Sequence, residues 1–372
     1  MSNITLSAGV RSNLLSLQDV AANFATTQNR LATGKKVNSA LDNPTNFFTS
    51  AALQSRAGEL ANLLDAMTNG INTLKAADNG MTSITATIQS MQATITQTRQ
   101  DASWQSTAYS IGTGTAMVAS FTGGAVGTTA VTVSLDTAAV PDTVDQAVAA
   151  INAVAGLTGK IKATNDAGTL RIQNLSTSAL TITGAAGGVL NGTTNTDSIG
   201  ANTVRTNLVT QFNLLRDQLD KTAGDASFNG VNLLAGDTLK LFFNETSSSS
   251  LTIQSSNTAG VNNSVLGITT GTNVEFQDNT QLDTRLNNLH TALTQVASQS
   301  SAFGANLSIV QNRQNFTTQM INTLQIGADG LTLADTNLEG ANMLALQTRQ
   351  QLSITALSIA SQSQGAVLRL FG

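Results

Sequence analysis

Two stretches of the chain repeat apolar residues every seven positions over about fifty residues each, and this repeat constrains the fold more than any other feature. In the first stretch, about residues 46–102, the repeat consists of Leu53, Leu60, Met67, Leu74, Met81, Ile88 and Ile95. The second stretch, about 281–325, uses Leu282, Leu286, Leu289, Leu293, Val296, Phe303, Leu307, Val310, Ile321 and Leu324. A seven-residue apolar repeat of this length favours long helices that supercoil around one another.

The two ends of the chain also carry helical periodicity. The N-terminal stripe is Val10, Leu14, Leu17, Ala21, Phe24, Gln28 and Leu31. The C-terminal stretch, about 332–370, has the stripe Leu338, Ala345, Leu352, Ile359 and Ala366, with Met343, Ile354, Leu357 and Leu368 off it. A helix that is apolar on more than one face needs burial on several sides. Its partner is either the N-terminal helix or other copies of the chain.

A different composition separates the helical stretches. Residues 105–200 are rich in Gly, Thr, Ala and Val, and strand-like alternation at 130–135 and 169–173 flanks a helical piece at 144–154. A shorter helix is predicted near 202–220, and strands and turns are predicted over 225–256. The predicted fold class is mainly α, with a long heptad coiled-coil rod, a small β-hairpin and an inserted α+β outer domain. The predicted boundaries are 1–40, 41–103, 104–201, 202–325 and 326–372.

Composition excludes several classes of function. Only 11% of residues are charged and the net charge is -4, which does not favour nucleic acid or an acidic membrane surface as a partner. The chain has no cysteine, and His290 is its one histidine. Thiol chemistry and paired-histidine metal sites therefore have no residues to use, and a lone histidine on a heptad helix is far more often structural than a metal ligand or a catalytic base. We expect no enzyme activity, no cofactor and no metal.

The N-terminus has no basic stretch followed by an apolar core, so we expect no cleavable secretory signal. No apolar run approaches the ~20 residues of a membrane span. If the protein leaves the cell, we expect another export route.

Three motifs, in order, resemble the bacterial flagellins. They are QNRLATGKKVNSA at 28–40, FNGVNLL at 228–234, and the segment from Asp335 that ends in AVLRLFG at 366–372. The resemblance covers about residues 1–103 and 202–372. Within the family, the chain resembles divergent flagellins of the alphaproteobacterial type. Residues 145–182 resemble, more weakly, a small domain inserted in flagellins and hook-associated proteins.

The resemblance implies a structural subunit that self-assembles into an extracellular flagellar filament for swimming. The terminal helices would form the inner core, 41–103 and 202–325 the rod, and 104–201 the outer part. The implied assembly residues are Val10, Leu14, Leu17, Phe24, Leu31, Leu338, Leu352, Ile359 and Leu368. The implied partners are other flagellin subunits, flagellar cap and hook-associated proteins, and a cytoplasmic export chaperone at the C-terminal segment. Export would use the flagellar type III channel.

Two segments depart from the family pattern. Ser90, Gln92 and Ala93 stand where many flagellins carry charged residues that an animal innate receptor recognises. Leu41, Asn43 and Pro44 stand where the segment bound by a plant receptor usually has charged or small residues. The departures predict weak recognition by both receptors.

Several alternatives remain open on the sequence. The heptads alone also fit a plain intramolecular bundle, and the terminal helices also fit a hook–filament junction protein. Residues 105–200 could form a surface adhesin. Polar residues interrupt the apolar stripes at Asp78, Thr85, Gln92, Ser300 and Gln314. We expect most of them to face solvent or the hairpin, and the alternative is that they fix register or permit a second packing.

Overall fold

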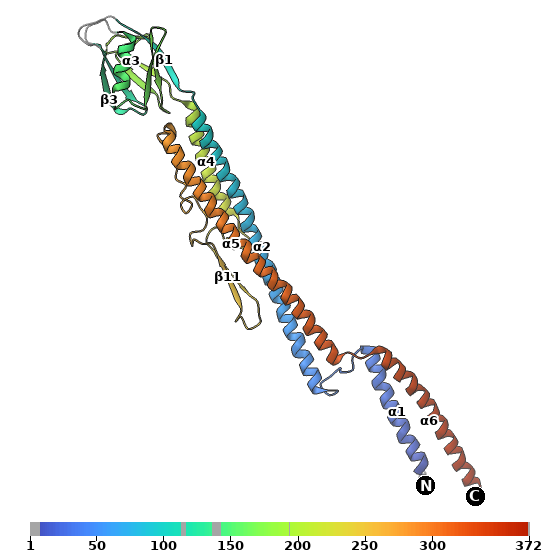
Figure 1. Ribbon diagram of the computed structural model, residues 1–372. Coiled ribbons are helices and arrows are strands. Elements are labelled where there is room, and N and C mark those ends of the chain that lie inside the picture. The colour runs from blue at the N-terminus through green and yellow to red at the C-terminus, as the bar shows by residue number, and fades with distance from the viewer. Residues whose placement is uncertain (1–7, 113–116, 136–142, 193, 371–372) are drawn as a thin grey trace. The chain divides into compact units, whose positions relative to one another are not determined.

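The computed structural model describes residues 8–112, 117–135, 143–192 and 194–370 (Figure 1). The side chains of residue 364 and of 367–370 lie outside this description. The chain is mostly helical, with a helix at each end and a sheet-containing middle region. It divides into two compact units. The first unit contains 1–68, 241–251 and 310–372, and the second contains 69–240 and 252–309.

Two long helices, α2 (Pro44–Gln100) and α5 (Asn279–Thr332), occupy the heptad stretches. Asn43 starts α2, because its side-chain oxygen accepts a hydrogen bond from the backbone N–H of Asn46 at 3.0 Å, and proline is favoured at the first helical position. Asp278 caps α5 through the backbone N–H of Thr280. Helix α5 ends at Thr332, beyond residue 325, where the predicted helical stretch ends.

The seven-residue repeats are buried. On α2 the buried positions are Leu60, Met67, Leu74, Met81, Ile88 and Ile95. On α5 they are Leu282, Leu289, Val296, Phe303 and Val310, and the repeat continues through Thr317 to Leu324. Buried residues therefore recur at intervals of seven along both helices. Supercoiling of the helices stays a prediction.

Polar residues that interrupt the stripes make bonds between α2 and α5. In the second unit, Ser300 donates to Asp78 at 3.2 Å, and the Gln92 amide lies 3.3 Å from His290 Nδ1. In the first unit, Gln314 donates to Thr68 Oγ1 at 3.0 Å. Thr85 donates to the carbonyl of its own helix. Asp78 is exposed and the other four positions are half-buried, so solvent reaches them as expected, and four of the five also bond across the two helices. A role in fixing register stays a prediction.

The described residues of the middle region form two sheets and one helix, all in the second unit. The strands are β1 (Gln105–Ile111), β2 (Val118–Gly123), β3 (Gly127–Ser134), β4 (Ile161–Asp166), β5 (Thr169–Asn174), β6 (Leu180–Thr183), β7 (Ala185–Ala186), β8 (Val189–Leu190) and β9 (Thr196–Ile199). They pair in the orders β4-β5-β1-β8-β7 and β3-β2-β6-β9. Helix α3 (Val144–Ala153) begins at a capping box between Thr143 and Gln146. The predicted strands at 130–135 and 169–173 and the helix at 144–154 are confirmed.

Apolar side chains from both sheets and α3 share one core, which includes Phe121, Ile151, Ile172 and Ile182. Tyr109 is fully buried in this core, and its hydroxyl donates to Asp197 at 3.1 Å. Burial and the neighbouring Asp197 carboxylate both raise the pKa of Tyr109. The single tyrosine therefore stays protonated as part of the core.

A turn and a hairpin follow helix α4 (Thr203–Asp225). Phe228 and Val231 exchange two backbone hydrogen bonds of 3.0 Å across Asn229 and Gly230, which both have positive φ. This geometry is a two-residue hairpin turn, and Asn-Gly is its preferred sequence. Strands β10 (Thr238–Phe242) and β11 (Ser250–Gln254) then pair as the predicted hairpin, and a short 3₁₀ helix, η1 (Glu275–Gln277), precedes α5.

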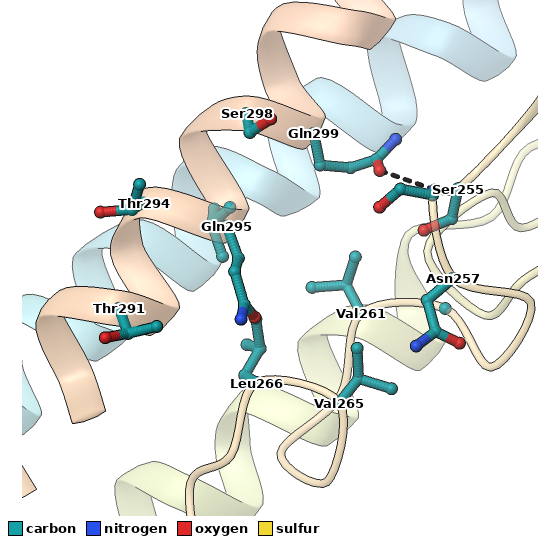
Figure 2. Close-up of a pocket in the computed structure, with 13 residues that line it drawn as sticks. Ser255, Asn257, Val261, Val265, Leu266, Thr291, Thr294, Gln295, Ser298 and Gln299 are labelled. Atoms are coloured by element: carbon teal, nitrogen blue, oxygen red, sulfur yellow. Dashed lines mark hydrogen bonds between the residues drawn. The ribbon is translucent and has the colours of Figure 1, made fainter.

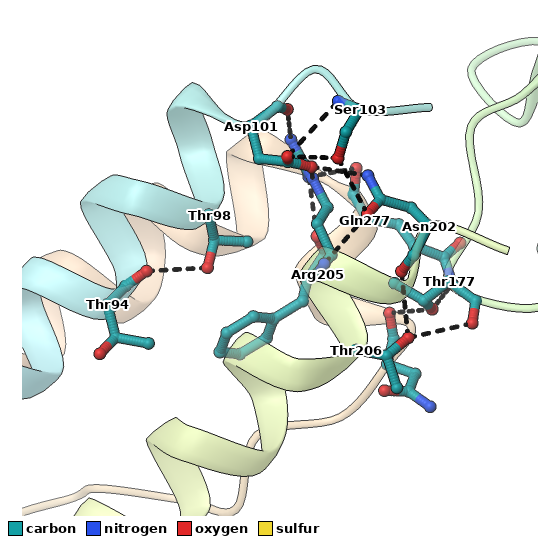
Figure 3. Close-up of polar contacts among 11 residues, drawn as sticks. Thr94, Thr98, Asp101, Ser103, Thr177, Asn202, Arg205, Thr206 and Gln277 are labelled. Atoms are coloured by element: carbon teal, nitrogen blue, oxygen red, sulfur yellow. Dashed lines mark hydrogen bonds and ion pairs between the residues drawn. The ribbon is translucent and has the colours of Figure 1, made fainter. Parts of the chain in front are cut away.

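A buried arginine joins the helices at the point where the chain enters the sheets (Figure 3). The Arg205 side chain is 3% exposed, and its guanidinium donates to the carbonyls of Phe276 at 2.7 Å and Asp101 at 3.0 Å. The Asp101 carboxylate lies 3.5 Å from Nε of Arg205 and accepts a hydrogen bond of 2.6 Å from Asn202. The guanidinium also lies 4.3 Å from the centre of the Trp104 ring. One side chain thus ties together the end of α2, the start of α4 and η1.

Candidate assembly interface

The terminal helices α1 (Ala8–Thr33) and α6 (Thr336–Leu370) have well-defined ends where they meet. Gly34 follows α1 with φ +67°, a left-handed conformation that commonly ends a helix. Asp335 starts α6 by accepting hydrogen bonds from the backbone N–H groups of Asn337 and Leu338 at 2.9 and 3.2 Å. The two connecting segments are bonded to each other, because Ala334 donates to the Gly34 carbonyl at 2.9 Å and Lys36 donates to the Thr332 carbonyl at 2.8 Å.

Helices α1 and α6 pack along each other (Figure 1). The buried and half-buried positions recur at spacings of three and four on both helices. They are Val10, Asn13, Leu17, Val20, Phe24, Thr27 and Arg30 on α1, and Glu339, Met343, Leu346, Gln350, Ser353, Leu357 and Ala360 on α6. We call these residues the terminal seam. An ion pair of 3.4 Å between Arg30 and Glu339 lies at one end of it.

The terminal seam leaves the C-terminal apolar stripe uncovered. Leu338, Leu352 and Ile359 are 59%, 64% and 63% exposed, and Ala345 between them is also exposed. We call these four residues the outer stripe. Leu344 and Ile354 are exposed on other faces of α6. On α1, Leu14, Leu15 and Leu31 are exposed. Apolar residues on several faces of a helix pair can be removed from water only by contact with other molecules.

The structure divides the predicted assembly residues into two groups. Val10, Leu17 and Phe24 belong to the terminal seam, so their contacts lie within one chain. Leu14, Leu31, Leu338, Leu352 and Ile359 are exposed and available to other chains. The side chain of Leu368 lies outside the described residues.

Sequence periodicity missed two exposed leucines, Leu15 on α1 and Leu344 on α6. Each lies outside the seven-residue stripe, so a search for that stripe passes over it. A count of the large apolar residues on each helix would have found them, because each helix carries more such residues than one face can hold. Conversely, Asn13 and Thr27 lie in the seam, although polar residues usually indicate surface.

The second set of predicted site residues lies on α2. Ser90 and Ala93 are exposed, and Ser90 Oγ donates to the Ala86 carbonyl of its own helix at 2.9 Å. Gln92 is half-buried beside His290. This surface carries no charge at the three positions. In the other departing segment, Leu41 is 96% exposed, whereas Asn43 and Pro44 form the start of α2.

Together these features define a class of protein. It is a mainly helical chain whose first and last helices pair with each other, while a line of large apolar side chains stays free along the pair. None of the helices in the described part of the chain is long and apolar enough to cross a bilayer.

Comparison with known proteins gives the family. A family model of the bacterial flagellin N-terminal helical region matches residues 6–114, and one of the C-terminal helical region matches 286–371. These two regions together make up more than half of the chain, which belongs to the bacterial flagellin family.

Individual relatives agree with the family models. Flagellin FljK of Caulobacter vibrioides is 34% identical over 164 residues, which are 44% of this chain and 59% of that protein. A flagellin of Brucella melitensis is 28% identical over 170 residues, covering 44% of this chain and 60% of the relative. Flagellin A of Rhizobium meliloti is 36% identical over 90 residues, covering 24% and 23% of the two chains. The chain thus matches about three fifths of the length of the first two relatives.

Proposed function

We propose that this chain is a structural subunit that polymerises into the extracellular filament of a bacterial flagellum and acts in swimming motility. The single observation that carries the proposal is the exposed outer stripe on a terminal helix pair, in a chain of the flagellin family. Each Leu or Ile buried between copies contributes ~1.5–3 kcal/mol, so several together offset the entropic cost of association. Contacts of this kind that do not close on themselves generate helical filaments.

The parts of the chain take different roles in this proposal. Residues 1–40 and 326–372 form the inner core of the filament, 41–103 and 202–325 form the rod around it, and 104–201 point outward. The subunit has no enzymatic role and uses no cofactor. Its further partners are the flagellar cap, hook-associated proteins and a cytoplasmic chaperone that binds the C-terminal segment, and it leaves the cell through the flagellar type III channel.

The experiment that tests the function is seeded assembly. Purified monomer is mixed with sheared filament fragments or a precipitant and examined by negative-stain microscopy, beside a version that lacks 332–372. We expect filaments from the full chain alone. A full chain that stays monomeric and folded by circular dichroism under all these conditions would contradict the proposal and favour the junction-protein or adhesin interpretation.

The polar pairs between α2 and α5 lead to a prediction about filament shape. Gln92→Leu and Gln314→Leu each replace a half-buried amide with an apolar side chain, and we expect the free energy of unfolding to rise by up to about 1 kcal/mol. If the pairs set the packing that a supercoiled filament requires, the waveform changes as well. Urea unfolding and electron micrographs of filaments measure the two effects. Raised stability with an unchanged waveform would remove any role in filament shape.

The uncharged surface of Ser90, Gln92 and Ala93 leads to a prediction about immune recognition. Because charge-assisted hydrogen bonds are the stronger ones, a receptor that binds charged residues loses them at this surface. We expect weak activation of reporter cells that carry the animal flagellin receptor, even at a high protein dose. A flagellin with the charged residues serves as the positive control, and full activation by this chain would refute the prediction.

A further inference from the structure

A pocket of about 420 Å³ lies in the second unit, between α5 and the loop that follows β11 (Figure 2). Its apolar part consists of Val261, Leu266 and Val296, which are buried, and of Val265, which is half-buried. Figure 2 shows Gln295 reaching from α5 toward Leu266 across this apolar part. The pocket belongs to neither the terminal seam nor the outer stripe.

The lining of the pocket has hydroxyl and amide groups but no ionisable side chain. Gln299 is held in place, because its Oε1 accepts a hydrogen bond of 2.8 Å from the backbone N–H of Ser256. Ser255 is 7% exposed, and its Oγ has no hydrogen-bond partner among the described residues. The apolar base of the pocket suits an uncharged aliphatic side chain, and the amides and hydroxyls around it can bond to the peptide groups next to that side chain. A charged ligand is disfavoured, because nothing in the lining would pair with its charge.

The same unit presents such a side chain at another place. Val274 is 73% exposed, more than any other large aliphatic residue described in this unit. It follows the uncharged residues Thr272 and Asn273. The neighbouring Glu275 carboxylate is bonded to Arg285 and to Thr272 Oγ1, so its charge is already paired. The segment around Val274 therefore matches the uncharged lining of the pocket.

We propose that the pocket receives Val274 of a second copy of this chain. This inference rests on the proposed function, since it requires the copies to polymerise. Val274 and the pocket are different surfaces, so the contact is heterologous: each copy uses its pocket for one neighbour and its Val274 for another. A contact of this type repeats without limit unless the rotation closes a ring. It adds an interaction in the second unit to the contacts of the outer stripe.

Covalent trapping tests the contact, and the absence of native cysteine makes the design clean. The full-length double variant Val274→Cys/Ser298→Cys places one thiol on the exposed valine position and one on an exposed position of the pocket rim. Filaments of this variant are treated with a short bismaleimide and run on a denaturing gel. We expect a ladder of dimers, trimers and higher oligomers, because each copy is linked to two neighbours. The double variant Val274→Cys/Ala297→Cys is the control, since Ala297 is exposed on the next position of α5 but does not line the pocket.

The outcomes separate the two proposals. Wild-type filaments together with a ladder specific to Ser298 support both. Filaments without a ladder, or with an equal ladder from the Ala297 control, overturn the pocket contact and leave the filament function intact. Dimers without higher oligomers also overturn it, since they indicate a closed contact. A wild-type chain that does not polymerise overturns both proposals.

A second measurement does not depend on cross-linking. Val274→Asp puts a charge into the proposed contact, and we expect the critical concentration for seeded assembly to rise about tenfold, as for the loss of one buried aliphatic side chain. Leu214→Asp is the matched control, because Leu214 is 65% exposed in the same unit. An equal effect of both substitutions, or an effect of Leu214→Asp alone, overturns the assignment of Val274.

Discussion

Leu352→Asp/Ile359→Asp is expected to abolish polymerisation at concentrations where the unaltered chain forms filaments, while leaving the monomer folded. Both side chains are more than 60% exposed in the single chain, so their loss removes little burial within it. In a polymer, each would contribute ~1.5–3 kcal/mol by burial, and a buried carboxylate without a partner costs more. The critical concentration for seeded assembly should therefore rise about 100-fold or more.

Sedimentation of polymer at a series of concentrations measures this effect, and circular dichroism checks that the helices are retained. The control is Gln351→Asp, which adds one carboxylate at a neighbouring exposed position of α6 outside the outer stripe. Its critical concentration should stay near that of the unaltered chain. Normal filament formation by the double variant would show that the outer stripe does not drive assembly.

Arg205→Met is expected to lower the free energy of unfolding of the second unit by about 3–5 kcal/mol, the usual cost of removing one partner of a buried ion pair. The substitution leaves the carbonyls of Phe276 and Asp101 without their donor and leaves the Asp101 carboxylate without its counter-charge. The guanidinium also packs on Trp104, which is the one tryptophan of the chain. Urea unfolding followed by tryptophan fluorescence therefore reports on this junction directly.

An exposed ion pair in the same unit supplies the control. Arg171 and Asp166 are each about half exposed, so Arg171→Met should cost less than about 1 kcal/mol. Equal losses from the two substitutions would contradict a special role for Arg205.

The acid dependence of unfolding gives the Arg205 prediction a second readout. Burial raises the pKa of Asp101, but hydrogen bonds from Ser103 and Asn202 and the charge of Arg205 outweigh it, and the pKa lies below its ordinary value. A carboxyl with a lowered folded pKa stabilises the fold above its unfolded pKa near ~3.9, and this contribution is lost as the pH falls further. In Arg205→Met the pKa of Asp101 rises toward its unfolded value, so we expect this variant to lose less stability than the unaltered chain as the pH falls below ~3.9, and the difference in stability between the two proteins to narrow there.

The long helices could be predicted from the sequence because a single local rule produces them. Apolar residues at intervals of seven, such as Met81 and Ile88, need one continuous buried face, and only a helix gives it. The Asn-Gly turn after Phe228 follows from local backbone preference in the same way. The sequence did not predict the short strands β6 to β9 one by one. Their pairing, such as that of Phe121 with Ile182, joins residues far apart in the chain, and a local pattern does not show it.

The candidate site could be predicted only in outline, since one stripe on a helix does not say what covers it. Leu17 and Leu14 both fit the N-terminal periodicity, yet Leu17 faces α6 and Leu14 faces outward. The choice depends on the rotation of α1 against α6, which places polar Asn13 and Thr27 inside the seam. Arg205 was missed for a related reason: charged residues are rarely buried, and the partners of its side chain come from two distant segments, 101–104 and 276–277.

The mixed composition of the terminal seam has a consequence for how a supply of subunits behaves. Asn13, Thr27, Gln350 and Ser353 occupy positions where apolar residues would hold α1 and α6 firmly together. Because these polar residues weaken the pairing, we expect α1 and α6 to separate more often in a lone subunit than a fully apolar pair would. The outer stripe is then rarely held in the arrangement that another subunit can bind, and two free subunits seldom start a polymer. An existing end, with its stripe already in place, acts as a template. If the subunits polymerise as proposed, we expect a concentrated stock to stay supersaturated and growth to occur at filament ends rather than throughout the solution.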